Sequence, residues 1–194
     1  SFIQAELDAY DGAIAYVDQL IYSLMDELGR MGKLDNTLVI ITSDHGEEFG
    51  EHGVYRHTNS LYLSTLFVPL MILFPGRVTE DVVVSNEVSL RDLPATVLDL
   101  LGIEDEAAFP GNTLSRFWNG AESGGETGEG YLMSEVNFAP NLPERFPVSK
   151  GDMKSLINSG FHYILNGDLQ EELYNFENDP WEQKNLAGAD EYSR

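Results

Sequence analysis

Three of the four histidines lie within thirteen residues, at positions 45, 52 and 57. Asp44 directly precedes the first of them, and Arg56 directly precedes the last. A carboxylate oxygen beside a neutral imidazole nitrogen is a donor pair that binds a divalent cation. A histidine or guanidinium beyond it can contact an anionic oxygen or protonate a leaving group. The cluster therefore predicts chemistry at an anionic centre, with Asp44 and His45 as metal ligands and with Arg56 and His57 as substrate contacts. The alternative for His57 is a solvated loop histidine.

The run Ser43-Asp44-His45-Gly46 has a simpler interpretation, which is an Asp-Gly turn that carries a surface histidine. Its position favours the metal site, because the run follows a buried strand and precedes two more histidines. Open α/β sheets place their ligand sites at this end of a strand. Gly46 would let the backbone turn away without a side chain intruding on the site.

The other titratable residues near the cluster are expected to play supporting parts. Glu51 and His52 should shape the loop, whereas Glu47 and Glu48 should be solvated or should support the ligands. His162 lies in a later extended segment and is expected to be structural.

The elements that precede the cluster indicate an α/β fold. Residues 37–42 form a continuous apolar run rich in β-branched side chains, which is typical of a strand covered on both faces, as in a parallel sheet. Residues 3–31 place apolar side chains at alternating steps of four and three, which predicts one long amphipathic helix. A coiled coil is the alternative for this helix, but the buried strand after it favours a helix that covers a sheet.

A second strand, over residues 67–74, and a helix over residues 92–101 continue this pattern. Composition changes near residue 119, where a Gly- and Glu-rich stretch predicts a loop or linker over residues 119–130. Beyond it, the short extended segments 131–138, 154–157 and 161–165 predict a small antiparallel sheet. We therefore expect an α/β region over residues 1–118 and a small α+β subdomain over residues 131–194.

The amino-acid composition of the chain argues against several classes of function. The chain has 194 residues, with 33 acidic and 11 basic side chains and a net charge of −22, which argues against nucleic acid as a partner. This acidity suggests either a salt-adapted source or simply an acidic protein. The absence of cysteine excludes a thiolate metal site and a cysteine nucleophile within this chain. No apolar run approaches the length of a membrane-spanning helix, so we expect no membrane span.

These motifs together resemble the sulfatases of the alkaline phosphatase superfamily. The resemblance rests on SDHGEEFGEHG at residues 43–53, HTNSLY at residues 57–62, VPL at residues 68–70, and ELYNFENDP at residues 172–180. It extends upstream to YDGAIAYVD at residues 10–18 and downstream to VSLRDLPATVLDL at residues 88–100. The matching motifs run along practically the whole chain and keep the order in which the family has them.

The resemblance implies part of an alkaline-phosphatase-like α/β/α sandwich, followed by a small antiparallel-sheet C-terminal subdomain. Sulfatases hydrolyse sulfate esters with a formylglycine and one divalent cation, usually calcium; manganese, magnesium and zinc are the alternatives here. Asp44 and His45 match the later metal-ligand pair of the family, and His57 matches the Lys or His that contacts the sulfate and the leaving oxygen. The implied substrate is a small sulfate ester or a sulfated glycan. Many members of the family are exported.

One departure from the family pattern limits this prediction. The chain contains no Cys/Ser-x-Pro-x-Arg motif and no early Asp-Asp pair, so it resembles only the C-terminal portion of a sulfatase. We expect the formylglycine outside this chain, in an N-terminal part of the same enzyme, and we expect the isolated chain to be inactive. Two alternatives remain open: a phosphonate or phosphodiester hydrolase or phosphotransferase of the same superfamily, and a non-catalytic acidic module.

Overall fold

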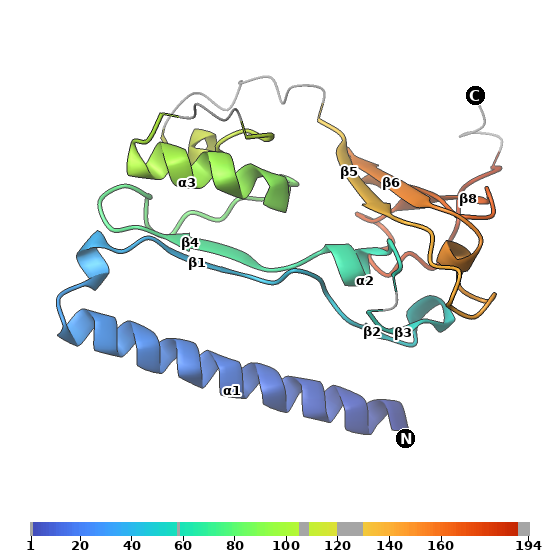
Figure 1. Cartoon of the computed structure of the whole chain (residues 1–194), viewed down its shortest axis with the longest axis horizontal. Coiled ribbons are helices and arrows are strands. Elements are labelled where there is room, and N and C mark those ends of the chain that lie inside the picture. The colour runs from blue at the N-terminus through green and yellow to red at the C-terminus, as the bar shows by residue number, and fades with distance from the viewer. Residues whose placement is uncertain (1, 58, 105–108, 120–129, 190–194) are drawn as a thin grey trace. The chain divides into compact units, whose positions relative to one another are not determined.

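A computed structural model describes residues 2–57, 59–104, 109–119 and 130–189 of the chain (Figure 1). It divides into two compact units. One comprises Gln4–Thr42 and Leu70–Glu129 and is called the helical unit below. The other comprises Ser1–Ile3, Ser43–Pro69 and Gly130–Arg194 and is called the sheet unit. Most of the loop predicted over residues 119–130 lies outside the described residues.

The helical unit begins with the long helix that the apolar spacing predicts, α1, Phe2–Arg30. Tyr10, Ile14 and Val17 of its apolar stripe are 41–53% exposed, so this chain leaves the middle of the stripe uncovered. In Figure 1, α1 and α3 lie on opposite sides of a pair of strands. None of the helices in the described ranges combines the length and the apolar character that crossing a membrane would require.

Both predicted strands of the helical unit are present. They are β1, Val39–Thr42, and β4, Leu70–Leu73. They pair with each other in antiparallel orientation, with Val39 opposite Leu73, whereas the buried-strand pattern had suggested a parallel sheet. A continuous apolar run indicates a strand that is buried on both faces, but it does not indicate the direction of the neighbouring strand.

The second helix of this unit, α3, Leu93–Leu101, begins one residue later than predicted and ends at the predicted residue. Pro94 stands in its first turn, and Gly102 ends it in the left-handed conformation at φ 67°. Asp92 precedes the helix, but its side chain does not cap it. The Asp92 carboxylate instead accepts the backbone N–H of Asn112 at 3.0 Å and pairs with Arg116 at 3.4 Å.

The sheet unit contains a four-stranded antiparallel sheet in the order β5-β6-β7-β8. Its strands are β5, Leu132–Val136; β6, Met153–Asn158; β7, Phe161–Leu165; and β8, Glu171–Asn175. The first three confirm the predicted sheet, and β8 is an additional strand. The unit also holds a short hairpin, β2 (Glu48–Phe49) with β3 (Tyr55–Arg56), and the one-turn helix α2 (Leu63–Leu66). Short 3-10 helices complete the described chain: Leu34–Asn36, Glu51–Gly53, Leu90–Asp92, Leu114–Phe117 and Pro147–Ser149.

One hydrophobic core joins the segment of residues 43–69 to the sheet. Seven buried side chains form it: Val54, Leu61, Phe146, Val148, Met153, Ile164 and Tyr174. Val54 and Leu61 come from the histidine-rich segment, and Ile164 and Tyr174 come from the inner face of the sheet. Burying such side chains is worth about 1.5–3 kcal/mol each, so the core fixes the histidine-rich segment on a rigid support.

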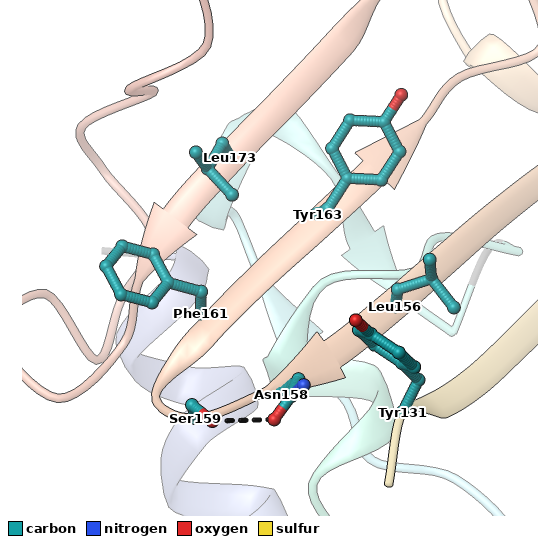
Figure 2. A pocket seen from close by; sticks show the side chains of 7 residues that line it. All are labelled: Tyr131, Leu156, Asn158, Ser159, Phe161, Tyr163 and Leu173. Atoms are coloured by element: carbon teal, nitrogen blue, oxygen red, sulfur yellow. Dashed lines mark hydrogen bonds between the residues drawn. The ribbon is translucent and has the colours of Figure 1, made fainter. Parts of the chain in front are cut away.

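The other face of the sheet carries a row of apolar side chains. Leu156, Tyr163 and Leu173 form one row across three strands, because the register places Leu156 opposite Tyr163 and Tyr163 opposite Leu173. Figure 2 shows the shallow hollow that these residues line together with Tyr131, Phe161 and the β6–β7 turn. In that turn, Ser159 donates a hydrogen bond to the Asn158 side chain at 2.7 Å. This face carries none of the histidine cluster.

Candidate functional site

The β2–β3 hairpin positions the histidine cluster. Glu48 pairs with Arg56 and Phe49 pairs with Tyr55, while Glu51–Gly53 closes the turn. Gly50 and Gly53 adopt positive φ angles of 115° and 71°, which favour glycine. His45 therefore lies before the first strand of the hairpin, and His57 lies directly after the second.

Gly46 is required by a close approach to a neighbouring segment. Its N–H donates to the carbonyl of Thr65 at 2.7 Å. A Cβ at this position would lie 2.0 Å from the Ser64 carbonyl oxygen, so no side chain fits. The glycine predicted to keep the site open thus also docks the Asp44-His45 turn on α2.

Asp44 and His45 offer a donor pair with a defined tautomer. The Nδ1 of His45 lies 2.8 Å from the Gly46 carbonyl oxygen, and since a carbonyl only accepts, Nδ1 carries the proton. The lone pair of Nε2 is then free to bind a cation. Nε2 lies 3.8 Å from Oδ2 of Asp44. Two ligands at right angles on one ion, each about 2.3 Å from it, are roughly 3.3 Å apart, so the pair suits one divalent cation.

His57 is held by Glu47, one of the two carboxylates that the sequence predicted to be solvated or to support the ligands. Its Nδ1 lies 3.0 Å from Oε2 of Glu47, so Nδ1 donates and Nε2 is left for another partner. The rings of His45 and His57 stack with their centroids 4.5 Å apart. One ligand atom from each of His45, Glu47 and His57 lies within 4.8 Å of the others, which is compact enough for a metal ion. The structure therefore brings both predicted histidines together and adds Glu47.

Arg56 stands beside this cluster without joining it. Its backbone adopts a positive φ of 67° and its side chain is exposed. Within the part of the chain that the structure describes, the guanidinium forms no ion pair with a carboxylate. It remains available to an anionic ligand.

Glu48 is buried rather than solvated. It is 1% exposed and accepts hydrogen bonds from the hydroxyls of Ser60 at 2.9 Å and Ser64 at 3.5 Å. Its Oε2 has no partner among the described atoms. The pKa of this carboxyl is raised from 4.5 to about 7, with burial as the largest cause; Glu51 and Glu47 contribute to the increase, and the hydrogen bonds from Ser60 and Ser64 oppose it.

Because this carboxyl is buried, we expect the free energy of unfolding to depend on pH. The unfolded chain loses the Glu48 proton near pH 4.5 and the folded chain keeps it to about pH 7. The folded state binds more protons in that window, so stability falls as the pH rises through it. Between pH 4 and pH 8 the loss should be of order 3 kcal/mol, and Glu48→Gln should remove it because the amide stays neutral. Urea denaturation at both pH values measures this, with the exposed Glu144→Gln as control; equal pH slopes in the wild type and Glu48→Gln would contradict the prediction.

The hairpin is anchored to the sheet by buried polar contacts. The ring of His52 stacks on Tyr62 at 3.6 Å, and the Tyr62 hydroxyl donates to Glu172 at 3.1 Å. Burial raises the pKa of Tyr62, so its hydroxyl stays a donor. Glu182 accepts the Leu63 N–H at 2.7 Å and pairs with the buried His162 at 2.5 Å. His162 is therefore structural, as predicted, and Glu51 and His52 shape the loop.

Comparisons with known proteins identify the family of the chain. The family model described as Sulfatase matches residues 3–103, which contain Asp44, His45 and His57. The choline-sulfatase of Rhizobium meliloti is 32% identical over 92% of this chain and 32% of its own length. The arylsulfatase of Clostridium perfringens is 27% identical over 95% of this chain and 36% of its own length.

A solved structure has a similar fold. The phosphonate monoester hydrolase of Agrobacterium radiobacter superposes with a TM-score of 0.77 and 27% identity, covering 92% of this chain and 36% of that one. Its likeness confirms that this chain has part of the alkaline-phosphatase-like fold. The chain spans about a third of the length of the curated relatives that it matches. By its motifs, its fold and these matches, the chain belongs to the sulfatase family.

Proposed function

We propose that this chain is the C-terminal region of a metal-dependent sulfatase, a sulfuric ester hydrolase that acts on a small sulfate ester or a sulfated glycan. The observation that carries the proposal is the free Nε2 of His45, 3.8 Å from the Asp44 carboxylate and in a ring stacked on His57. We infer that Asp44 and His45 bind the cation and that His57 donates a proton, which is the combination that hydrolysis of an anionic ester requires.

The donor set fits one divalent cation. When bound, such an ion acts as a Lewis acid that stabilises negative charge on the sulfate oxygens. Asp44 would supply a carboxylate oxygen and His45 would supply Nε2. The resemblance to sulfatases favours calcium, whereas manganese, magnesium and zinc compete, and an imidazole nitrogen suits zinc better than calcium. The remaining ligands would come from outside this chain.

His57 acts on the leaving group. As an oxygen nucleophile from outside this chain bonds to sulfur, the ester S–O bond breaks, and its electron pair goes to the alkyl or aryl oxygen, which becomes negative. The protonated His57 donates its Nε2 proton to that oxygen, and Glu47 stabilises the imidazolium through the 3.0 Å contact at Nδ1. The exposed Arg56 guanidinium would bind a sulfate oxygen.

The rest of the enzyme is the partner that this chain requires. The formylglycine nucleophile would come from an N-terminal part of the same enzyme, because this chain contains no Cys/Ser-x-Pro-x-Arg motif. The exposed apolar side chains of α1 support such a partner, as do Met71 and Leu73 of β4, which are 56% and 36% exposed. Burying such a surface is favourable, and an isolated protein seldom leaves it in water. The isolated chain should therefore be inactive.

A phosphonate monoester hydrolase is the second candidate, and the superposition on the enzyme of Agrobacterium radiobacter favours it. Such an enzyme would use the same Asp44, His45 and His57 on a phosphorus centre. A non-catalytic acidic module is the third, and it would have no use for the ordered tautomers of His45 and His57.

The deciding experiment uses the complete enzyme that contains this chain. Its hydrolysis of 4-nitrophenyl sulfate and of a phenyl phosphonate monoester is measured, and the nucleophile is identified by peptide mass spectrometry. We expect a formylglycine and a preference for the sulfate ester. An unmodified Thr or Ser with a preference for the phosphonate would replace the sulfatase proposal by the second candidate, and inactivity on both with no metal bound would favour the acidic module.

A further inference from the structure

A separate hollow lies at the tip of the β2–β3 hairpin. Glu51, His52, Trp181 and Gln183 line it, and its volume is about 260 Å³. Two of these residues come from the hairpin turn, and the other two come from the segment after β8. All four belong to the sheet unit. The proposed sulfatase chemistry uses none of them.

One wall of the hollow is fixed by a buried residue between its two lining residues. Glu182 adopts a positive φ of 53°. This left-handed conformation costs a residue other than glycine about 1–3 kcal/mol. Its carboxylate is 2% exposed and is held by His162 and by the Leu63 N–H. While Glu182 points inward, its neighbour Trp181 stays 62% exposed. The strained backbone thus presents Trp181 and Gln183 to the hollow.

The opposite wall is fixed in the same way. His52 also has a positive φ of 53°, and its ring lies flat against Tyr62 with 7° between the planes. Oε2 of Glu51 accepts the Phe49 N–H at 2.6 Å, which orients the carboxylate. His52 and Glu182, neither of which is glycine, therefore both adopt left-handed conformations beside this hollow. Backbone strain of this kind is common at binding sites.

The lining indicates the chemistry of the ligand. It combines a largely exposed indole, a carboxylate, an amide and the imidazole of His52, which lies flat against Tyr62, and none of the four residues is Lys or Arg. An organic cation is attracted by the face of an indole, and tryptophan is the best aromatic residue for this. The net charge of −22 attracts cations and repels anions. We propose that this hollow binds an organic ammonium group.

The hairpin connects this site to the cluster at its base. Glu47 and His57 lie at the open end of the hairpin, and Glu51 lies four residues further along, at most about 13 Å away. A substrate of the length of a disaccharide spans that distance. The ammonium group would then belong to the part of the substrate that carries no sulfate; this last step rests on the proposed sulfatase function, whereas cation binding itself does not.

Fluorescence of the 194-residue chain tests the site directly. The chain has two tryptophans, and Trp118→Phe leaves Trp181 as the single reporter. This change should be tolerated, because Nε1 of Trp118 is buried with no hydrogen-bond partner. Tetramethylammonium chloride is the probe, with sodium chloride at equal concentration as reference. We expect a saturable change in emission with a Kd of about 1–50 mM. Broadening of the probe's methyl NMR signal by the unmodified chain provides a second measurement.

Two variants complete the test. Glu51→Gln should weaken binding roughly fivefold or more, because the amide keeps the shape but loses the charge. Glu144→Gln removes one exposed carboxylate elsewhere in the sheet unit and should leave the Kd unchanged. An equal response to sodium chloride, or equal binding by Glu51→Gln and the unmodified chain, would overturn the proposal. Saturable binding of methyl glucoside without binding of tetramethylammonium would replace it by a neutral sugar site. None of these results depends on sulfatase activity.

Discussion

Replacing Asp44 with alanine in the complete enzyme is expected to lower kcat/KM for a sulfate ester by about 10³-fold or more. The variant removes one of the two proposed metal ligands that this chain supplies, and with it the charge stabilisation that the ion provides. The Asp44 side chain is 88% exposed, so its loss should leave the stability of the fold nearly unchanged. Steady-state kinetics and metal content, measured on the same preparation, check both statements.

Two further variants sharpen this test. Asp44→Asn keeps an oxygen donor without the charge, so its activity should lie between those of the wild type and Asp44→Ala and should rise with added metal. Asp35→Ala removes an exposed carboxylate in the 3-10 helix Leu34–Asn36 and should change neither activity nor metal content. Full metal occupancy and full activity in Asp44→Ala would contradict the assignment of Asp44 as a ligand.

Local patterns predicted most of the elements of this fold. The helix of residues 3–31 follows from the spacing of its apolar side chains, and α3 follows from Pro94 and Gly102. The strand direction in the β1–β4 pair did not follow, because partner direction is decided by chain connections and not by the composition of a strand. β8 was missed because its sequence, EELYN, begins with two acidic residues that weaken the alternating pattern.

The contacts of the residues that support the site depend on the register of the β2–β3 hairpin. Local sequence patterns do not predict that register. Glu47 faces His57 because Glu48 pairs with Arg56 and Phe49 with Tyr55, and the next pair outward is Glu47 with His57. Gly50 and Gly53 were the signal that would have indicated this turn and hence the contact. Glu48 was expected to be solvated or to support the ligands; it is buried instead, and the hydroxyls that it contacts belong to Ser60 and Ser64, which lie 12 and 16 residues further along the chain.

Replacing His57 with alanine is the second change with a large expected effect. It removes the proposed proton donor, so kcat for a poor leaving group, such as an alkyl sulfate, should fall by about 10²–10⁴-fold. The loss should be smaller for 4-nitrophenyl sulfate, because 4-nitrophenolate is stable enough to leave without a proton. Kinetics across a series of aryl and alkyl sulfates give this dependence as a slope, which should steepen in the variant. A merely structural role of His57 would not change that slope.

Glu47→Gln separates orientation of the imidazole from stabilisation of its charge. The amide oxygen can still accept the Nδ1 proton, so the ring should keep its tautomer while the imidazolium loses its counter-charge. We expect a loss of about tenfold in kcat, smaller than that of His57→Ala and with the same dependence on the leaving group. Glu87→Gln, an exposed carboxylate of the helical unit, is the matched control. A uniform loss for all leaving groups would make His57 a sulfate-binding residue. A loss of metal as large as in Asp44→Ala would instead make His45, Glu47 and His57 the metal ligands, since these three are already close enough to share one ion.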